Sequence, residues 1–138
     1  MFDVFPTHLS RCHDSILHIT NSGNSYVYGC RNPGLWFCND KFHMCSAING
    51  NWNYCYDSKR FNANNWIKVQ VEQKMINNKY YYSITLNDAT VYSIINSQPR
   101  VFHNMKLYVS DPWYSTMSGN IKNLVIRTRT EPGKVSLK

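Results

Sequence analysis

Residues 66–88, WIKVQVEQKMINNKYYYSITLND, carry the clearest structural signal in the chain. Apolar residues recur at every second position in both halves of this stretch, which is the period of half-buried strands. Asn77 and Asn78, between the two halves, tolerate left-handed backbone and are typical of tight turns. The stretch therefore predicts an antiparallel hairpin with strands over residues 66–73 and 80–86.

Strand and turn signals of the same kind recur on both sides of this hairpin. Asn and Gly residues separate short apolar runs, and no useful length of sequence shows the 3.6-residue period of an amphipathic helix. Further strands are predicted over residues 15–20, 25–28, 41–48, 52–57, 90–95, 105–109 and 121–126. Many short strands at close spacing predict an all-β fold, either an antiparallel β-sandwich or a barrel.

The composition agrees with one all-β domain. A chain of 138 residues is long enough for a two-layer core but short for two domains. Aromatic residues make up 14% of it, and aromatic residues favour strands. The 17 Asn residues lie mainly between the predicted strands, where Asn serves turns.

The formal charge of +7 indicates an affinity for anionic partners. Such an excess attracts nucleic acids, anionic membranes or acidic glycans. The basic residues are spread along the chain. The nearest approach to a cluster is formed by Arg127, Arg129, Lys134 and Lys138, and a solvated C-terminal tail explains these residues equally well. Binding of single-stranded nucleic acid needs aromatic and basic residues interleaved on one exposed face, whereas Tyr81 stands alone among Ser and Thr. No nucleic-acid partner is therefore expected.

Five cysteines crowd into the first 55 residues, at positions Cys12, Cys30, Cys38, Cys45 and Cys55. They form no CxxC pair, so their spacing is poor for a structural zinc site and favours disulfides made in an oxidising compartment. An odd number leaves one free thiol or one intermolecular bridge. We therefore expect a secreted or extracellular protein. The sequence has no Asn-x-Ser/Thr acceptor, no signal-peptide pattern at its start and no apolar run of transmembrane length.

One disulfide follows from a predicted hairpin around Asn49-Gly50-Asn51. If the loop has three residues, Ile48 faces Trp52 and, counting outward, Cys45 faces Cys55 at bridging distance. A two-residue turn would instead place Cys45 opposite Tyr54. On the first alternative we predict a Cys45–Cys55 disulfide.

Four segments together resemble the concanavalin A-like lectin and glucanase superfamily, on its galectin and laminin-G side. They are NNWIKVQVEQ (64–73), KYYYSITLND (79–88), INSQPRVFHNMKLYVSD (95–111) and SGNIKNLVI (118–126), and RNPGLWF (31–37) and FHMCSAINGNWNYC (42–55) extend the match to roughly residues 15–128. The resemblance implies an antiparallel β-sandwich of jelly-roll type. It implies a lectin-like domain over residues 1–130 and leaves a basic C-terminal tail over 131–138.

The sugar site of galectins does not carry over to this chain. That site uses a His, Asn and Arg constellation on one strand and a Trp followed by Glu and Arg, whereas Trp66 is followed by Ile67-Lys68. Arg31-Asn32-Pro33 matches only part of the constellation. Asp88 or Asp111 could serve as the rim Asp of a laminin-G-type calcium site, so calcium is possible, but the spacing demands no metal and no cofactor is predicted.

The sequence indicates no enzyme. Glucanases of this superfamily need two neighbouring carboxylates, and the only Glu residues are Glu72 on a strand and Glu131 in the tail. Cys12-His13 and His18 suggest a Cys/His pair, but neighbours on a strand point to opposite faces. A disulfide cysteine beside surface histidines explains them better.

Three groups of residues are candidate ligand contacts. Arg31, Trp36 and His43 could line the concave sheet, and Asn49, Asn51 and Trp52 lie at a hairpin tip. Trp113 and Tyr114 follow Asp111-Pro112, where proline forces a turn. Each group also has a structural interpretation: the Asn residues serve the turn, and Trp113 folds back to seal the core, which leaves Tyr114 as the more exposed of the two aromatics.

These observations predict a non-catalytic extracellular recognition domain. It would act as a lectin-like or adhesion module that binds a glycan or glycoprotein, with acidic or sulfated glycans favoured by the positive charge. The alternative is a protein-binding or self-associating β-sandwich without sugar binding. A homodimer could form through an edge strand, and the odd cysteine could add a bridge.

Overall fold

The computed structural model describes residues 1–9 and 12–128. This part of the chain consists of strands, turns and loops without a helix, which confirms the all-β prediction. The strands are β1 (Phe2–Pro6), β2 (Cys12–Thr20), β3 (Gly34–Cys38), β4 (Lys41–Ile48), β5 (Asn51–Asp57), β6 (Ile67–Ile76), β7 (Lys79–Leu86), β8 (Ala89–Asn96), β9 (Lys106–Val109) and β10 (Gly119–Lys122). The predicted tail over 131–138, the domain end at 130, and Arg129, Lys134 and Lys138 lie outside the described residues.

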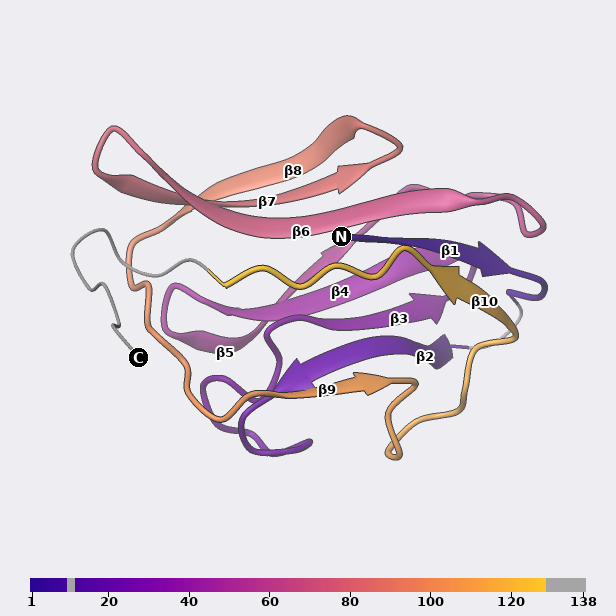
Figure 1. The fold of residues 1–138 in the computed structure, drawn as a ribbon, viewed down its shortest axis with the longest axis horizontal. Helices are drawn as coiled ribbons and strands as arrows, with labels where there is room; N and C mark the ends of the chain where they lie inside the picture. Colours follow the sequence, from indigo (N-terminus) through magenta and orange to yellow (C-terminus); the bar gives the residue numbers. More distant parts are fainter. Residues whose placement is uncertain (10–11, 129–138) are drawn as a thin grey trace, which may run out of the picture.

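The strands form two antiparallel sheets that lie face to face in a sandwich-like arrangement (Figure 1). Sheet A has the order β10-β1-β6-β7-β8, and sheet B has the order β5-β4-β3-β2-β9. The chain therefore crosses between the layers four times: after β1, β5, β8 and β9. No helix in the described residues is long and apolar enough to cross a membrane.

The core lies between the two sheets because each strand turns alternate side chains toward the other layer. On β3 and β4, the cross-strand pairs Leu35–Met44 and Phe37–Phe42 point inward and are fully buried. On sheet A, Val69 and Ile84 meet them from the other side. The wider cluster of buried apolar residues is Phe2, Val4, Leu9, Ile16, Leu17, Leu35, Phe37, Phe42, Met44, Ile48, Ile67, Val69, Tyr82, Ile84 and Met117.

The hairpin of residues 66–88 forms as predicted. Strands β6 and β7 pair from Val69–Leu86 to Ile76–Lys79, which leaves Asn77 and Asn78 as a two-residue turn. Both have positive φ, 48° and 59°, so the turn uses the left-handed conformation that Asn tolerates.

Two of the predicted strands differ from the structure. Residues 25–28 form no strand; they belong to a loop over 21–33, and β2 pairs with β3 and β9 instead. The last predicted strand, 121–126, ends at Lys122, and residues 123–128 are extended beside the N-terminus, where Met1 and Val125 exchange backbone hydrogen bonds. Strand β1, FDVFP, in which every second residue is buried, was not predicted from the sequence.

The Cys45–Cys55 disulfide is present, but the predicted turn was wrong. Ile48 faces Asn51, so Asn49-Gly50 is a two-residue turn. A bulge between Ser46 and Ile48 inserts one extra residue into β5, and beyond it Cys45 again faces Cys55. A second disulfide joins Cys12 of β2 to Cys38 of β3.

The fifth cysteine, Cys30, is a free thiol with no exposed surface. The alternative of an intermolecular disulfide through Cys30 is therefore wrong for the folded chain, because the buried sulfur cannot reach the sulfur of a second molecule. Burial also raises the pKa of the Cys30 thiol, which keeps it protonated and unreactive.

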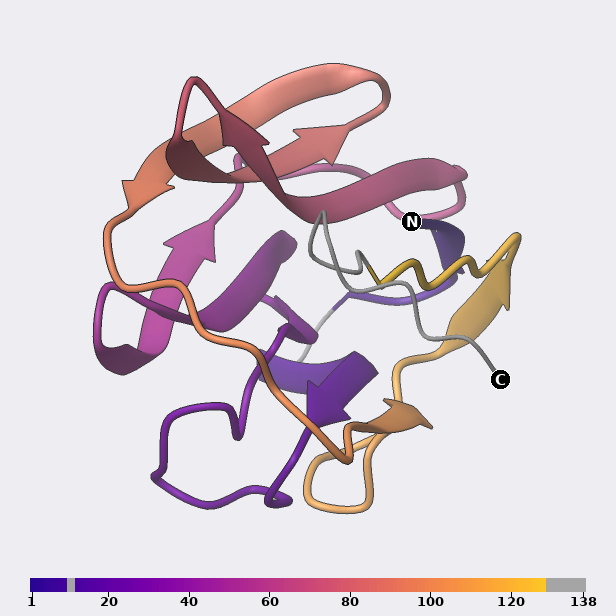
Figure 2. The same cartoon turned by 60° about the vertical axis from the view of Figure 1, so that its left-hand side comes forward.

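While residues 115–117 run along β2, residues 21–33 and the first part of the 110–118 loop lie on the face of sheet B that is turned away from sheet A (Figure 2). We call this side the outer face of sheet B. The first loop is fixed to β2 and β4 by backbone hydrogen bonds, in which Asn32 donates to Ile19 (2.8 Å) and Ala47 donates to Arg31 (2.9 Å). The outer face is thus a layer of loops over a sheet.

Candidate functional site

Arg31, from the 21–33 loop, contacts residues of sheet B and of both loops on the outer face. Its guanidinium is 5.1 Å from the ring centroid of Trp36 and 5.2 Å from that of Trp52, so it lies against two indoles at cation–π distance. We call the group of residues around it the Arg31 cluster: Asn24, Arg31, Trp36, Trp52, Asn53 and Tyr114.

The polar partners of Arg31 are all neutral. Its Nη2 donates to the Tyr114 hydroxyl (3.2 Å) and to Asn24 Oδ1 (3.4 Å), and its Nη1 donates to Asn53 Oδ1. Among residues 1–9 and 12–128, no carboxylate forms an ion pair with Arg31. A half-buried positive charge is therefore left without a counter-charge from this part of the chain.

Two buried donors in the cluster also lack an acceptor. Arg31 Nε and Trp36 Nε1 are both inaccessible, and neither has a hydrogen-bond partner within the described residues. Buried polar groups are nearly always hydrogen-bonded in folded proteins, so these two donors are exceptions.

Trp36 forms the floor of the cluster rather than an exposed platform. It is 1% exposed, which makes the prediction that it lines an open concave sheet wrong. Its ring lies over Gly34, where an added Cβ would stand 2.1 Å from Trp36 Cη2. The absence of a side chain at Gly34 is what lets the indole lie flat on the sheet.

The exposed aromatic surface comes from Trp52 and Tyr26 instead. Trp52 is half-buried, and Tyr26, from the 21–33 loop, is 81% exposed. Their rings meet edge to face at 5.2 Å. Aromatic rings of this kind can stack on the apolar face of a sugar. Tyr26 was missed because residues 25–28 were predicted as a strand.

His43 lies beside the cluster on β4. Its ring is 6.1 Å from that of Trp36, its Nδ1 is 2.7 Å from Asp57 Oδ1, and its Nε2 is 3.3 Å from Cys45 Sγ. The donor atoms of His43, Cys45 and Cys55 lie within 4.8 Å of one another, but the two sulfurs are bonded to each other. In this form they offer no thiolate to a metal.

His13 faces both His43 and Tyr114, at 5.7 and 5.6 Å between ring centroids. Partial burial, with the nearby charges of His43 and Arg31, lowers the pKa of His13. Cys12 forms a disulfide and His13 is exposed, as predicted for a disulfide cysteine beside surface histidines. The same interpretation is wrong for His18, which is fully buried.

Trp113 and Tyr114 are positioned by Asp111. Both backbone N–H groups donate to Asp111 Oδ1, at 3.0 and 3.1 Å. Trp113 packs on His18 (5.4 Å) and is 38% exposed, whereas Tyr114 is half-buried against Trp36 (5.4 Å). The prediction that Tyr114 is the more exposed of the two is therefore wrong, because its hydroxyl is drawn inward by Arg31.

Asn49 and Asn51 serve the hairpin rather than the cluster. Asn49 Oδ1 accepts from Ser97 N (2.7 Å), and Asn49 N donates to Asn96 Oδ1 (3.1 Å), which ties the turn of sheet B to the end of β8. Asn51 Oδ1 accepts from Asn53 N (2.9 Å). Of the two interpretations of Asn49 and Asn51, the structure agrees with the one in which they stabilise the hairpin turn.

The two carboxylates considered for calcium have other partners. Asp88 is 2.6 Å from Lys68 Nζ, and Asp111 is buried with its oxygens bonded to His18, Ser15 and two backbone N–H groups. The oxygens of Asp111 are thus occupied by protein donors, and Lys68 pairs with one oxygen of the exposed Asp88.

The structure thus brings Arg31, Trp36, Trp52 and Tyr114 into one cluster, with His43 beside it. Asn24 and Asn53, which sequence reasoning missed, supply its amide groups. Asn53 could have been found, because it lies two residues before Cys55 and so shares a strand face with it. Comparisons of the chain with protein-family models, curated proteins and solved structures gave no match.

Proposed function

We propose that the chain is a non-catalytic extracellular recognition domain of the concanavalin A-like jelly-roll type that binds an acidic or sulfated glycan at the Arg31 cluster. Two facing five-stranded antiparallel sheets with four crossovers support this type of fold. Two disulfides support an oxidising compartment.

One observation carries the choice of ligand: Arg31 has no carboxylate partner in the described residues, although it is half-buried. Guanidinium binds sulfate and carboxylate oxygens through charge-assisted hydrogen bonds. Tyr26, which is 81% exposed, supplies an aromatic surface on which a sugar ring can stack.

The absence of a catalytic role rests on the carboxylates. Glu72 lies on β6 of sheet A, where its Oε1 is 2.6 Å from Lys74 Nζ, remote from the Arg31 cluster on sheet B. Of the carboxylates near the cluster, Asp57 is hydrogen-bonded to His43, and Asp111 is buried with its oxygens bonded to Ser15, His18 and two backbone N–H groups. A glycosidase would need two carboxylates flanking one bond.

A glycan array with matched neutral, sialylated and sulfated oligosaccharides tests the proposal. We expect signal for the acidic ligands, and calorimetric titration with the best of them should show Arg31→Gln weakening binding by about tenfold to a hundredfold. Lys106→Gln, which removes an exposed charge on β9, is the matched control and should bind as the parent does. A flat array, or equal affinity in Arg31→Gln, would contradict the proposal.

A second candidate, self-association through an edge strand, is favoured by the sequence of β8. This strand, ATVYSIIN, is an edge of sheet A, carries no charge or proline, and exposes Val91 and Ile95. Such edges pair with other strands unless they are blocked. Light scattering of the parent and of Ser93→Lys tests this: a dimer that the lysine dissociates supports it, and a monomeric parent contradicts it.

A further inference from the structure

A pocket of about 370 Å³ opens between the two sheets, away from the Arg31 cluster. It lies on the side where β5 and β8, the edge strands of the two sheets, face each other. At one end of this side the sheets are tied together by contacts such as that between the Tyr54 and Tyr92 hydroxyls. Beside this contact, the smaller Val91 and the linker after β5 line the open space.

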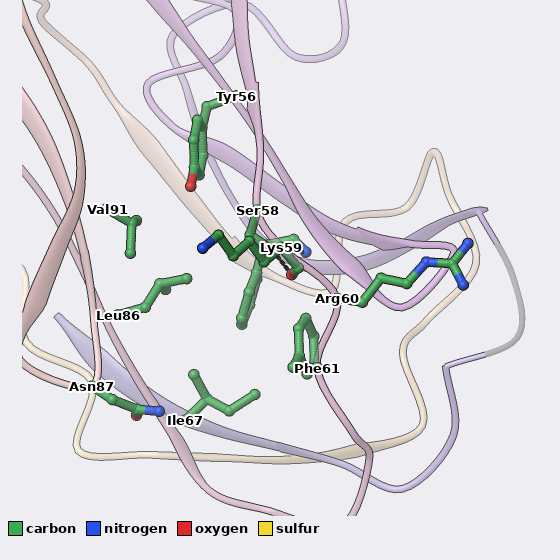
Figure 3. Close-up of a pocket in the computed structure, with 10 residues that line it drawn as sticks. Tyr56, Ser58, Lys59, Arg60, Phe61, Ile67, Leu86, Asn87 and Val91 are labelled. Atoms are coloured by element: carbon green, nitrogen blue, oxygen red, sulfur yellow. Dashed lines mark hydrogen bonds between the residues drawn. The ribbon is translucent and has the colours of Figure 1, made fainter.

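The walls of the pocket are apolar and reach the core. Ile67, Leu86 and Val91 come from sheet A, and Tyr56 and Phe61 face them (Figure 3). Phe42, which is fully buried, also lines it and stacks on Phe61 at 4.8 Å. A chain of methylene groups that entered here would therefore leave water for a largely hydrocarbon environment.

Ser58 and Asn87 at the pocket are hydrogen-bonded to their neighbours, whereas three donors around it are available to a ligand. Lys59 and Arg60 are exposed at its rim, and neither forms an ion pair within the described residues. None of the ten described residues that line the pocket is acidic. The Tyr56 hydroxyl has no hydrogen-bond partner in this part of the chain, and burial raises its pKa, so that it remains a donor.

From this geometry we propose that the pocket binds a single-chain anionic amphiphile, such as a medium-chain fatty acid. The alkyl chain occupies the space between Ile67, Leu86 and Phe61. The carboxylate meets Lys59 and the Tyr56 hydroxyl at the rim. Arg60, whose side chain points away from the pocket in Figure 3, adds only long-range attraction.

Volume and charge together select this class of ligand. Small-molecule sites are mostly apolar clefts of about 300–1,000 Å³ with a few placed polar groups, and this pocket is near the lower end of that range. An uncharged alcohol would leave Lys59 uncompensated, and an alkylammonium ion would be repelled by two cations. The site is remote from Arg31, so it does not depend on the proposed glycan function.

Titration of the intact protein with hexanoate, octanoate and decanoate tests the proposal. Affinity should rise by about fourfold for each methylene that enters the pocket. Decanoate should bind more tightly than decanol, and decylammonium should bind least. The methyl NMR signals of Ile67, Leu86 and Val91 should shift on addition of decanoate, which places the ligand.

Three variants separate the pocket from general surface binding. Val91→Phe narrows the pocket and should weaken decanoate by about tenfold or more, because fewer methylenes are buried. Lys59→Glu should weaken it by about threefold to tenfold. Lys106→Glu makes the same charge change on β9 and should leave affinity unaltered, as should Arg31→Gln.

The proposal is overturned by any of four results: no chain-length dependence, shifts confined to methyl groups outside the pocket, equal binding of decylammonium, or unchanged decanoate affinity in a Val91→Phe protein with a native circular dichroism spectrum. If that variant does not fold, the charge series and the NMR shifts on the parent protein decide. A glycan array without signal would leave these outcomes unaffected, because it reports on the Arg31 cluster alone.

Discussion

Asp111 is a buried carboxylate whose hydrogen bonds position the aromatic loop beside the Arg31 cluster. Its Oδ2 accepts from Ser15 Oγ (2.9 Å) and lies 3.1 Å from His18 Nδ1, while His18 Nε2 donates to the Cys30 carbonyl (2.7 Å). The His18 ring thus bridges the Asp111 carboxylate and the Cys30 carbonyl. The group links β2, the end of the 21–33 loop and the 110–118 loop.

Loss of stability in acid is expected from Asp111. Burial alone would raise its pKa, but hydrogen bonds from His18, Ser15 and Trp113 N, with the charge of His18, lower the pKa below its ordinary 3.8. A carboxyl with a lowered folded pKa stabilises the fold above pH 3.8, and this contribution disappears as the pH falls through the folded value.

Asp111→Asn should therefore cost about 3–5 kcal/mol of unfolding free energy at neutral pH, because it leaves His18 facing a neutral amide. Urea denaturation at neutral pH and at successively lower pH checks this. The parent protein should lose stability below pH 4 more steeply than the variant. Parallel curves would show that Asp111 is not the group responsible.

Gly34 is a second residue at which a single substitution should destabilise the fold. An alanine methyl there would stand 2.1 Å from the Trp36 ring, so Gly34→Ala should displace the indole and cost about 1–3 kcal/mol. Thermal denaturation measures the loss. In a Trp36→Leu background the same change should cost less, and additive effects would contradict the proposed clash.

At the scale of elements, local signals predicted the hairpins and missed the loops. Asn77-Asn78 and Asn49-Gly50 mark turns through their backbone preferences, which act within a few residues. The 21–33 loop is shaped by contacts with distant segments, such as Arg31 with Tyr114 at 3.2 Å. No local pattern encodes such contacts, so the strand predicted over 25–28 was wrong.

The disulfide hairpin shows how a correct pairing can follow from a wrong turn. The sequence does not reveal the bulge that offsets the two-residue turn and restores Cys45 opposite Cys55. The pairing of β1 with β6 and β10 joins segments more than sixty residues apart, so neither the order of the sheets nor the Arg31 cluster could be read from local pattern.

Substitutions of Asn49 separate the contribution of its backbone conformation to stability from that of its side-chain hydrogen bond. Asn49 has a φ of 52°, and its Oδ1 accepts from Ser97 N. Asn49→Ala should cost about 2 kcal/mol through both the left-handed backbone and the lost hydrogen bond. Asn49→Gly keeps the backbone and should cost about half as much; equal losses in urea denaturation would assign the whole effect to the hydrogen bond.

At the scale of the whole molecule, polar contacts across the core hold the two sheets in register. Tyr82 of sheet A reaches Ser46 of sheet B at 2.9 Å, and both are buried. Near the edge, the Tyr54 and Tyr92 hydroxyls also meet. A buried pair of this kind permits few relative positions of the layers, because sliding one sheet would leave both hydroxyls unsatisfied.

Tyr82 should therefore make the sandwich sensitive to alkali. Burial raises the pKa of Tyr82 to about 12, against an ordinary 10.0, and the bond to Ser46 only partly opposes this. A phenol with a raised folded pKa contributes stability that is fully present below pH 10 and is lost as the pH rises toward 12, by roughly 2–3 kcal/mol. Tyr92, whose pKa is also raised to about 12, changes in the same direction.

Tyr82→Phe separates the two contributions. At neutral pH it should cost about 1–3 kcal/mol, because the Ser46 hydroxyl loses its partner in a buried position. Between pH 10 and 12, however, its unfolding free energy should fall less steeply than that of the parent, since the phenol that resists ionisation is gone. Tyr92→Phe is the matched control at the half-buried edge and should cost less at neutral pH. Urea denaturation across this pH range measures all three proteins, and an alkaline slope unchanged by Tyr82→Phe would place the sensitive group elsewhere in the sandwich.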